Sequence, residues 1–243
     1  MTATISRLSS LAWQEVGPDV RGASLDDPAH AGDEDMRTEV LQLGAHGRVE
    51  LAPVAGSDRY LFVLSGRARL SDGRRRSDLG PRTFAALDDT QRATLEGTDA
   101  PDTLILSVLA PAPGAPHSLP GARTGGTVLD IAEQPVVEEP ASGKRRVYLA
   151  TETTTGSKRA HGMVVTYRAD TVTPMHHHPN ASSLFVFLDG SGVVVANGRE
   201  IPVDPGVAIR YGRGDRHALR CADGRGMRFL EFHIPGAYET ISG

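Results

Sequence analysis

The sequence predicts an all-β protein made of two tandem barrels, and three observations lead to this prediction. The 243 residues include 27 glycines and 16 prolines, which favour turns between short strands over long helices. The apolar runs are short and end in turns that contain glycine. The pattern of one half of the chain recurs in the other half, which indicates two domains of similar fold.

The repeat is clearest in the turns. Leu64–Gly66 corresponds to Leu188–Gly190, and the Asp-Gly-Arg of residues 72–74 corresponds to the Asn-Gly-Arg of residues 197–199. Asp-Gly and Asn-Gly both tolerate positive φ, so each predicts a β-hairpin. The two copies are offset by about 125 residues, a length typical of one barrel or sandwich.

A segment rich in Pro, Gly and Ala separates the two copies. Residues 111–126 lack apolar periodicity, which is typical of a linker or an extended crossing. The predicted organisation is an N-terminal arm (residues 1–37), a first barrel (38–110), a linker or crossing segment (111–146) and a second barrel (147–243).

Composition argues against several classes of partner. The net charge is -4, with 26 Lys and Arg against 30 Asp and Glu, so no basic surface for nucleic acid is indicated. We recognise neither a signal peptide nor an apolar run of about 18 residues that would span a membrane. Cys221 is the single cysteine, which excludes an internal disulfide. We therefore expect a cytoplasmic protein with no nucleic-acid or membrane partner.

Three consecutive histidines, His176 to His178, precede an apolar run. Residues two apart lie on the same face of a β-strand, so His176 and His178 would point one way and His177 the other. Inside a barrel, the first two imidazoles can share one metal ion. The alternative, with His177 as a ligand and its neighbours turned away, supplies a single ligand from this strand. His217, which follows a glycine-rich turn, is the candidate for a further ligand.

The spacing of these residues resembles the two sequence motifs of the cupin superfamily, G-x5-H-x-H-x(3,4)-E-x6-G and G-x5-P-x-G-x2-H-x3-N. Six positions match in register: His176, His178, Gly190, Gly206, Gly214 and His217. The whole chain is similar to a bicupin. The resemblance implies two double-stranded β-helix (jelly-roll) barrels, a metal site in the second barrel at His176, His178 and His217, and a homodimer.

Four positions depart from the cupin motifs. Asp170, Gly212 and Cys221 replace a glycine, a proline and an asparagine, and Ser183 replaces the glutamate that ligates the metal. A serine hydroxyl is a poor ligand unless it is deprotonated, so the expected site has three histidines and no carboxylate. A divalent cation held by three neutral imidazoles keeps its full charge. Its open positions then favour water, hydroxide or an anionic chelating substrate.

Three functions are compatible with such a site. Three-histidine iron(II) sites occur in cupin-like dioxygenases, so the resemblance favours Fe(II) and an oxygenase that acts on a small anionic or enolisable substrate. Zn(II), Mn(II), Ni(II) and Cu(II) are alternatives. A non-redox isomerase, cyclase or lyase would use the metal as a Lewis acid. In the third alternative the protein only binds a ligand, and the histidine run binds metal adventitiously or not at all.

Strand parity extends the candidate pocket. If Ser183 faces inward, Phe185 and Phe187 do too, where they would line a pocket or fill the core. From His217, the same argument points Cys221 inward as a small apolar neighbour of the site.

Four further residues could take part in binding or catalysis. Arg210 or Tyr211, just before the second motif, would hold a substrate carboxylate at the mouth of the barrel. Glu231 and His233 share one face of the last long strand and are acid/base candidates if that face is inward. The sequence leaves open which face that is.

The first half lacks the histidines of the second. An offset of 124 to 125 residues places Ala52 and Val54 opposite His176 and His178, and Arg92 opposite His217. We therefore expect the first barrel to be a scaffold without a metal.

Overall fold

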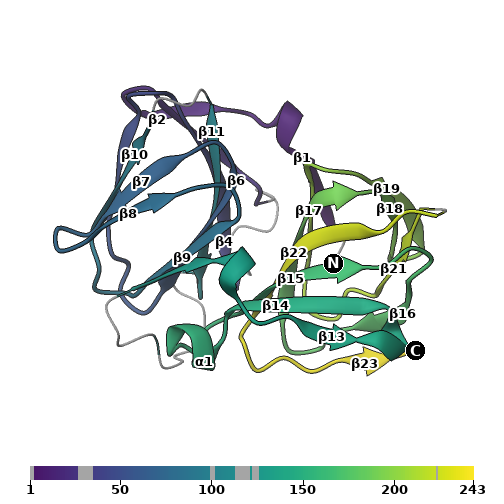
Figure 1. Cartoon of the computed structure of the whole chain (residues 1–243). Helices are drawn as coiled ribbons and strands as arrows, with labels where there is room; N and C mark the ends of the chain where they lie inside the picture. Colours follow the sequence, from purple (N-terminus) through teal and green to yellow (C-terminus); the bar gives the residue numbers. More distant parts are fainter. Residues whose placement is uncertain (1–2, 27–34, 99–101, 113–120, 122–125, 223) are drawn as a thin grey trace. The chain divides into compact units, whose positions relative to one another are not determined.

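The computed structural model describes residues 3–26, 35–98, 102–112, 121, 126–222 and 224–243 (Figure 1). In these ranges nearly all regular structure is β-strand, with one short α-helix, α1 (Glu152–Thr155). The predicted all-β class is confirmed. No helix in the described part of the chain has the length and apolar character needed to cross a membrane.

The chain divides into two compact units, and neither is a single continuous segment. One contains residues 11–134 and 152–159, and the other contains 1–10, 135–151 and 160–243. The beginning of the chain, which the sequence assigns to an arm, thus belongs to the second unit. There its strand β1 (Thr4–Arg7), purple in Figure 1, pairs with β20 (Val207–Tyr211).

The first unit is built from two antiparallel sheets. Their strand orders are β12-β9-β6-β11-β4-β3-β2 and β5-β10-β7-β8. Leu, Val, Ala and Ile side chains from both sheets form its core. The strands are β2 (Gln14–Gly17), β3 (Val20–Ser24), β4 (Arg37–Leu43), β5 (Arg48–Leu51), β6 (Asp58–Ser65), β7 (Ala68–Ser71), β8 (Arg76–Leu79), β9 (Thr83–Leu87), β10 (Ala93–Gly97), β11 (Thr103–Ala110) and β12 (Thr127–Asp130).

The second unit repeats this architecture. Its sheets have the orders β1-β20-β17-β22-β15-β14-β13 and β19-β18-β21-β16-β23. Aromatic residues are more frequent in its core. Its other strands are β13 (Val137–Glu139), β14 (Lys144–Ala150), β15 (His161–Tyr167), β16 (Val172–His177), β17 (Ser182–Gly190), β18 (Gly192–Ala196), β19 (Arg199–Val203), β21 (His217–Cys221), β22 (Met227–Ile234) and β23 (Ile241–Ser242).

The two predicted hairpins are present. β7 pairs with β8 around Asp72-Gly73, and β18 pairs with β19 around Asn197-Gly198. Asn197 and Gly198 both have positive φ, 48° and 79°. These values fit a two-residue turn that matches the twist of its strands, which explains why Asn-Gly is favoured there.

Gly190 is required for a different reason. It ends β17 with a φ of 74°, and a Cβ atom there would lie 2.0 Å from the carbonyl oxygen of Gly226. Gly198 has a similar φ of 79°, but a Cβ atom would meet nothing within 4 Å. A comparison of substitutions at Gly190 and Gly198 therefore separates the cost of backbone strain, which both share, from the cost of a steric clash, which only Gly190 has.

We expect Gly190→Ala to destabilise the protein more than Gly198→Ala. Both substitutions carry the strain of a left-handed residue, roughly 1–2 kcal/mol. Gly190→Ala also forces two backbone segments apart, which adds about 1–3 kcal/mol. Guanidinium denaturation followed by circular dichroism measures both free energies of unfolding. Equal losses in the two variants would show that the approach of Gly226 does not constrain this position.

Candidate metal centre

A β-bulge places His176 opposite His217. In the antiparallel pair of β16 and β21, Thr173 is the partner of Leu219 and His176 is the partner of His217. Two residues of β16 but only one of β21 lie between these pairs, so β16 contains one extra residue. Thr173 and His176 therefore both face partners on the inward side, although they are three positions apart.

The structure brings the three predicted ligands together. One nitrogen each from His176, His178 and His217 lies within 4.8 Å of the others. The ring centroids are 4.3 Å apart for His176 and His217, 5.3 Å for His176 and His178, and 5.4 Å for His178 and His217. His178 and His217 are buried and His176 is half-buried. Among the described residues, no other such group of three or more His, Cys, Asp or Glu was found.

Backbone carbonyls fix the orientation of all three rings. The Nδ1 atoms of His176, His178 and His217 lie 2.9, 2.8 and 2.9 Å from the carbonyl oxygens of Pro174, Glu239 and Asp215. A carbonyl oxygen only accepts, so each Nδ1 carries the hydrogen and each neutral ring keeps its lone pair on Nε2. The Nε2 atoms of His178 and His217 are buried and have no hydrogen-bond partner in the described part of the chain.

Burial keeps these imidazoles neutral near pH 7. It lowers the pKa of His176 below its ordinary value, that of His178 to about 4 and that of His217 to about 3. The physical cause is the loss of hydration of the charged ring, reinforced by the neighbouring histidines. A neutral ring with a free Nε2 is the form of histidine that binds a metal ion.

His177 lies outside the cluster. It is the last residue of β16 and pairs with Ile241 of β23, while His176 pairs with Ser242. The cluster of converging nitrogens contains its two neighbours instead. This placement follows the alternation of side chains along the strand.

The C-terminal residues 237–242 form a strap along the site. Asn180 holds this strap: its Nδ2 donates to the carbonyl of Ala237 over 2.9 Å, and its Oδ1 accepts from the amide of Glu239 over 2.8 Å. The carbonyl of Glu239 in turn orients His178. Asn180 therefore positions one ring of the cluster through the strap.

Removal of Asn180's side chain should loosen the strap. In Asn180→Ala the amide of Glu239 loses its acceptor, and two hydrogen bonds worth about 1 kcal/mol each disappear. We expect this amide to exchange with deuterium at least about tenfold faster. Ser242→Ala, an exposed substitution in the same strap, is the control and should leave the rate unchanged. Unaltered exchange in Asn180→Ala would mean that Asn180 does not anchor the strap.

The face of β22 that the sequence left open is the inward one. Ser183 pairs with His233 and Phe185 with Glu231 across β17 and β22, and Phe185 belongs to the core. The Oγ of Ser183 lies 2.8 Å from Nδ1 of His233, and Nε2 of His233 lies 2.7 Å from Oε1 of Glu231. A hydrogen-bonded chain thus runs from Ser183 through His233 to Glu231.

Glu231 carries a negative charge in the wall of the barrel. Burial alone would raise the pKa of its carboxyl group. The hydrogen bond from His233 and the positive charge of Arg146 outweigh burial and lower that pKa to about 2. Its side chain is 14% exposed, against 0% for His233.

Aromatic rings pack around the histidines. Tyr211 stacks on His217 with ring centroids 4.3 Å apart and an interplanar angle of 23°. Phe185 meets His217 edge-on at 5.6 Å. On the other side, His233 lies 4.5 Å from His178 and is stacked at 3.9 Å by Tyr238. Burial raises the pKa of Tyr238 to about 12, so its hydroxyl stays protonated at neutral pH.

Sequence reasoning missed Tyr238 and His161. His161 contacts the rings of Tyr148 and Tyr238, with centroids 5.4 and 5.3 Å away. Alternation along the strand places His161 on the same face as the core residues Met163 and Val165, so its inward direction could have been predicted from the sequence. Tyr238 lies in the strap after the last long strand, where no periodicity indicates its direction.

Three predicted pocket residues lie away from the cluster. Cys221 is at the opposite end of β21 from His217, about 13 Å along the strand, and its thiol donates to the carbonyl of Arg168. Phe187 packs in the core four positions beyond Ser183. Arg210 alternates with the core residues Ile209 and Tyr211, so it lies on the other face of β20. Of the two alternatives, Arg210 or Tyr211, it is Tyr211 that faces the cluster, where it stacks on His217.

The first barrel has apolar residues at the equivalent positions. Leu51 and Ala93 form the same directly opposed pair between β5 and β10 that His176 and His217 form between β16 and β21. Both are buried. These residues, rather than Ala52 and Arg92, occupy the positions of His176 and His217. The offset is 125 residues at Leu51 (176 − 51) and 124 at Ala93 (217 − 93), the reverse of the offsets that gave Ala52 and Arg92.

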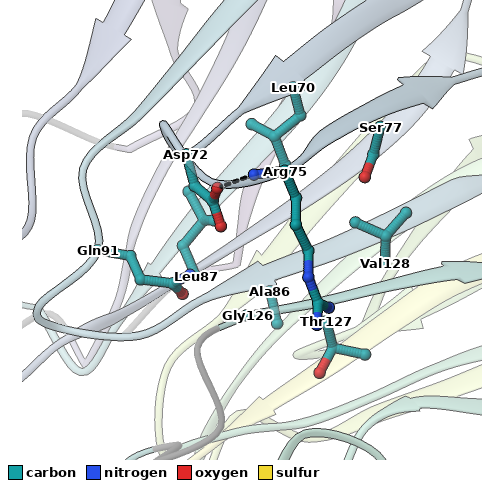
Figure 2. Close-up of a pocket in the computed structure, with 10 residues that line it drawn as sticks. All are labelled: Leu70, Asp72, Arg75, Ser77, Ala86, Leu87, Gln91, Gly126, Thr127 and Val128. Atoms are coloured by element: carbon teal, nitrogen blue, oxygen red, sulfur yellow. Dashed lines mark hydrogen bonds between the residues drawn. The ribbon is translucent and has the colours of Figure 1, made fainter.

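The first unit does contain a pocket, with a volume of about 250 Å³. Figure 2 shows Arg75 and Thr127 among the residues that line it, with Asp72 accepting the backbone N–H of Arg75 over 2.7 Å. Leu70 and Leu87, two core residues, also line it. No histidine or cysteine is among the residues that line it, so it offers no counterpart of the metal centre.

Comparisons with known proteins agree with this architecture. Residues 163–233 match the family model of the cupin domain. Protein Ylba from E. coli has a similar structure, with a TM-score of 0.78 and 14% identity over 96% of this chain and 90% of that chain. No curated protein sequence matches.

Two further similar structures are oxalate decarboxylases. The enzyme from Lactobacillus farciminis, in a formate complex, has a TM-score of 0.74 and 13% identity over 98% of this chain and 88% of its own. The Bacillus subtilis enzyme has a TM-score of 0.73 and 14% identity over 100% and 78%. At such identities the likeness shows the fold alone. The predicted fold of cupin-type jelly-roll barrels is confirmed, whereas the family model itself matches only within the second barrel.

Proposed function

We propose that the second barrel holds one divalent metal ion on Nε2 of His176, His178 and His217, and that the protein is a metal-dependent enzyme of the cupin type. One observation carries this proposal. Three rings donate from Nδ1 to backbone carbonyls, and one nitrogen of each ring lies within 4.8 Å of the others. Two of the Nε2 atoms are buried without a partner in the described residues, which costs free energy unless a ligand satisfies them.

The ligand set favours an anionic substrate. Three neutral imidazoles leave the charge of a divalent ion uncompensated, and the expected open positions suit a small chelating anion. When Fe(II) is bound, such a site supplies oxygen chemistry, which is the activity we propose first. Zn(II), Mn(II), Ni(II) and Cu(II) fit the same nitrogen donors. The homodimer expected from the resemblance stays a prediction.

The protein's own residues have distinct roles in this proposal. Tyr211 and Phe185 pack against His217 and exclude water from one side of the site. Tyr238 and His233 cover His178 on the other side. Ser183, His233 and Glu231 supply a polar wall in an otherwise aromatic environment.

A second function is a non-redox isomerase, cyclase or lyase. The observation that favours it is the hydrogen-bonded chain from Ser183 to Glu231, because such chains can hold or move a proton beside a substrate. The similar oxalate decarboxylases act, by their name, on a dicarboxylate, which supports an anionic substrate for this chain. In this alternative the metal serves as a Lewis acid.

Metal content tests the site. We expect close to one equivalent of metal per chain in protein purified without a histidine tag, and its loss in His217→Ala. His177→Ala is the matched control, because it removes the neighbouring imidazole that lies outside the cluster. Elemental analysis gives both values. A metal that stays in His217→Ala but leaves with His177→Ala would contradict the assignment of ligands.

Oxygen uptake separates the two enzymatic alternatives. The iron-loaded protein should consume O₂ with a small enolisable or hydroxylated acid, whereas the zinc-loaded protein should not. Turnover by the zinc protein under strict anaerobiosis would favour the isomerase, cyclase or lyase. Metal binding without any turnover across diketones, thiols and hydroxylated aromatic acids would instead support a ligand-binding protein.

A further inference from the structure

Another pocket of the first unit, which we call the Arg59 pocket, has a volume of about 730 Å³ and is lined mainly by residues of β2, β3, β4, β6 and β11. Ser107 lines it and pairs with Glu39 of β4 on one side and with Leu61 of β6 on the other. Directly paired residues share one face of a sheet, and Leu61 belongs to the core. Ser107 and Glu39 therefore lie on the inner face of the barrel. Arg59, two positions before Leu61, lies on the same face.

Arg59 occupies the place in the first barrel that Ser183 has in the second. The strands β6, β11 and β4 take the same positions in one sheet order that β17, β22 and β15 take in the other. Arg59 pairs with Leu109 of β11, as Ser183 pairs with His233 of β22. The Arg59 pocket is thus at the end of the first barrel that corresponds to the histidine cluster in the second, and it carries a fixed positive charge of its own.

One edge of the guanidinium of Arg59 is available to a ligand. Its Nη1 donates to Oε1 of Glu39 over 3.2 Å and to Oγ of Ser107 over 2.9 Å. Among the described residues, none accepts a hydrogen bond from its Nε or Nη2. The parallel N–H bonds of these two atoms match the two oxygens of a carboxylate. The side chain is only 16% exposed, which strengthens an ion pair formed there relative to one at the open surface.

The charged side chains that line the Arg59 pocket balance one another. Arg37 and Arg59 are positive, and Asp26 and Glu39 are negative. Oδ1 of Asp26 accepts from the backbone amide of Thr38 over 2.9 Å. Glu39 is 41% exposed and contacts Arg59, so a simple anion bound to Arg59 would meet a like charge, which is unfavourable. A ligand that also brings an ammonium group to Glu39 removes this repulsion.

Apolar side chains line another part of the pocket. Val16, Val54 and Leu109 are among them. Sites for small molecules combine such apolar walls with a few polar groups, and their volumes are roughly 300–1,000 Å³. The Arg59 pocket therefore suits a small molecule with two opposite charges and an apolar body.

We propose that the Arg59 pocket binds a small zwitterion, an α-amino acid with an apolar side chain, with its carboxylate on Nε and Nη2 of Arg59 and its ammonium group at Glu39. The apolar side chain of the ligand lies against Val54 and Leu109. The inference does not depend on the metal centre, because every residue that it uses belongs to the first unit. The first barrel is then a ligand-binding domain as well as a scaffold.

Three compounds of similar shape test this proposal: leucine, 4-methylpentanoate, which lacks the amino group, and 3-methylbutylamine, which lacks the carboxylate. Titrations of the full chain followed by nitrogen-15 NMR give the dissociation constants and the amides whose shifts change. We expect leucine to shift the amides of Glu39, Arg59 and Ser107 and to bind about tenfold more tightly than either analogue, the range of one charge-assisted hydrogen bond. Equal binding of leucine and 4-methylpentanoate would overturn the proposal, as would the absence of saturable leucine binding.

Variants assign the binding to named residues. Arg59→Gln should weaken leucine binding at least about tenfold. Arg69→Gln is the matched control, because Arg69 also forms an ion pair, with Asp78 over 3.0 Å, but does not line the pocket. If the amide spectrum shows that Arg59→Gln does not fold, Arg37→Gln, an exposed change in the same pocket, should weaken binding severalfold. Undiminished leucine affinity in the folded variant would contradict the proposal.

His217→Ala separates this inference from the proposed function. Leucine can also chelate a divalent ion, so its binding to this variant must match that of the wild-type protein. Binding that is lost in His217→Ala, with shifts confined to the second barrel, would place leucine at the metal centre and overturn the Arg59 pocket. Leucine binding to a protein that holds no metal would support the Arg59 pocket and contradict only the metal centre.

Discussion

Three hydrogen bonds from imidazole Nδ1 atoms to backbone carbonyls determine what the second barrel can do. Each carbonyl comes from a different local structure: Pro174 from the bulge in β16, Asp215 from the turn before β21, and Glu239 from the C-terminal strap. The carboxylate of Asp215 secures its turn by accepting from the amide of Gly212 and from Asn197. The metal centre therefore depends on backbone geometry as much as on the histidines themselves.

Much of the fold could be predicted because its signals are local. Asn197-Gly198 requires positive φ, and the inward placement of His176 and His178 follows from strand parity. Parity also distinguishes Arg210 from Tyr211, because the alternation along β20 turns Tyr211 toward the core and Arg210 to the other face. Short-range patterns thus predicted which residues share a face and which turns connect them.

The rest could not be predicted because it depends on contacts distant in sequence. The inward face of β22 is set by its pairing with β17, some fifty residues away in the register Ser183–His233. The carbonyl of Glu239 accepts a hydrogen bond from His178, and it belongs to a C-terminal strap whose path no sequence pattern predicts. The positions of Leu51 and Ala93 also depend on strand pairing. A shift of one residue in each strand decides which residues of the first barrel are equivalent to His176 and His217.

The most direct test of this account is the tautomeric state of the three imidazoles in metal-free protein. Nitrogen-15 NMR at pH 7 distinguishes Nδ1–H from Nε2–H rings and from imidazolium. We expect neutral rings with hydrogen on Nδ1 for His176, His178 and His217, consistent with the lowered pKa values of these residues. Hydrogen on Nε2, or a charged ring, at two of the three positions would contradict it, because the nitrogens that converge would then have no lone pairs to offer a metal.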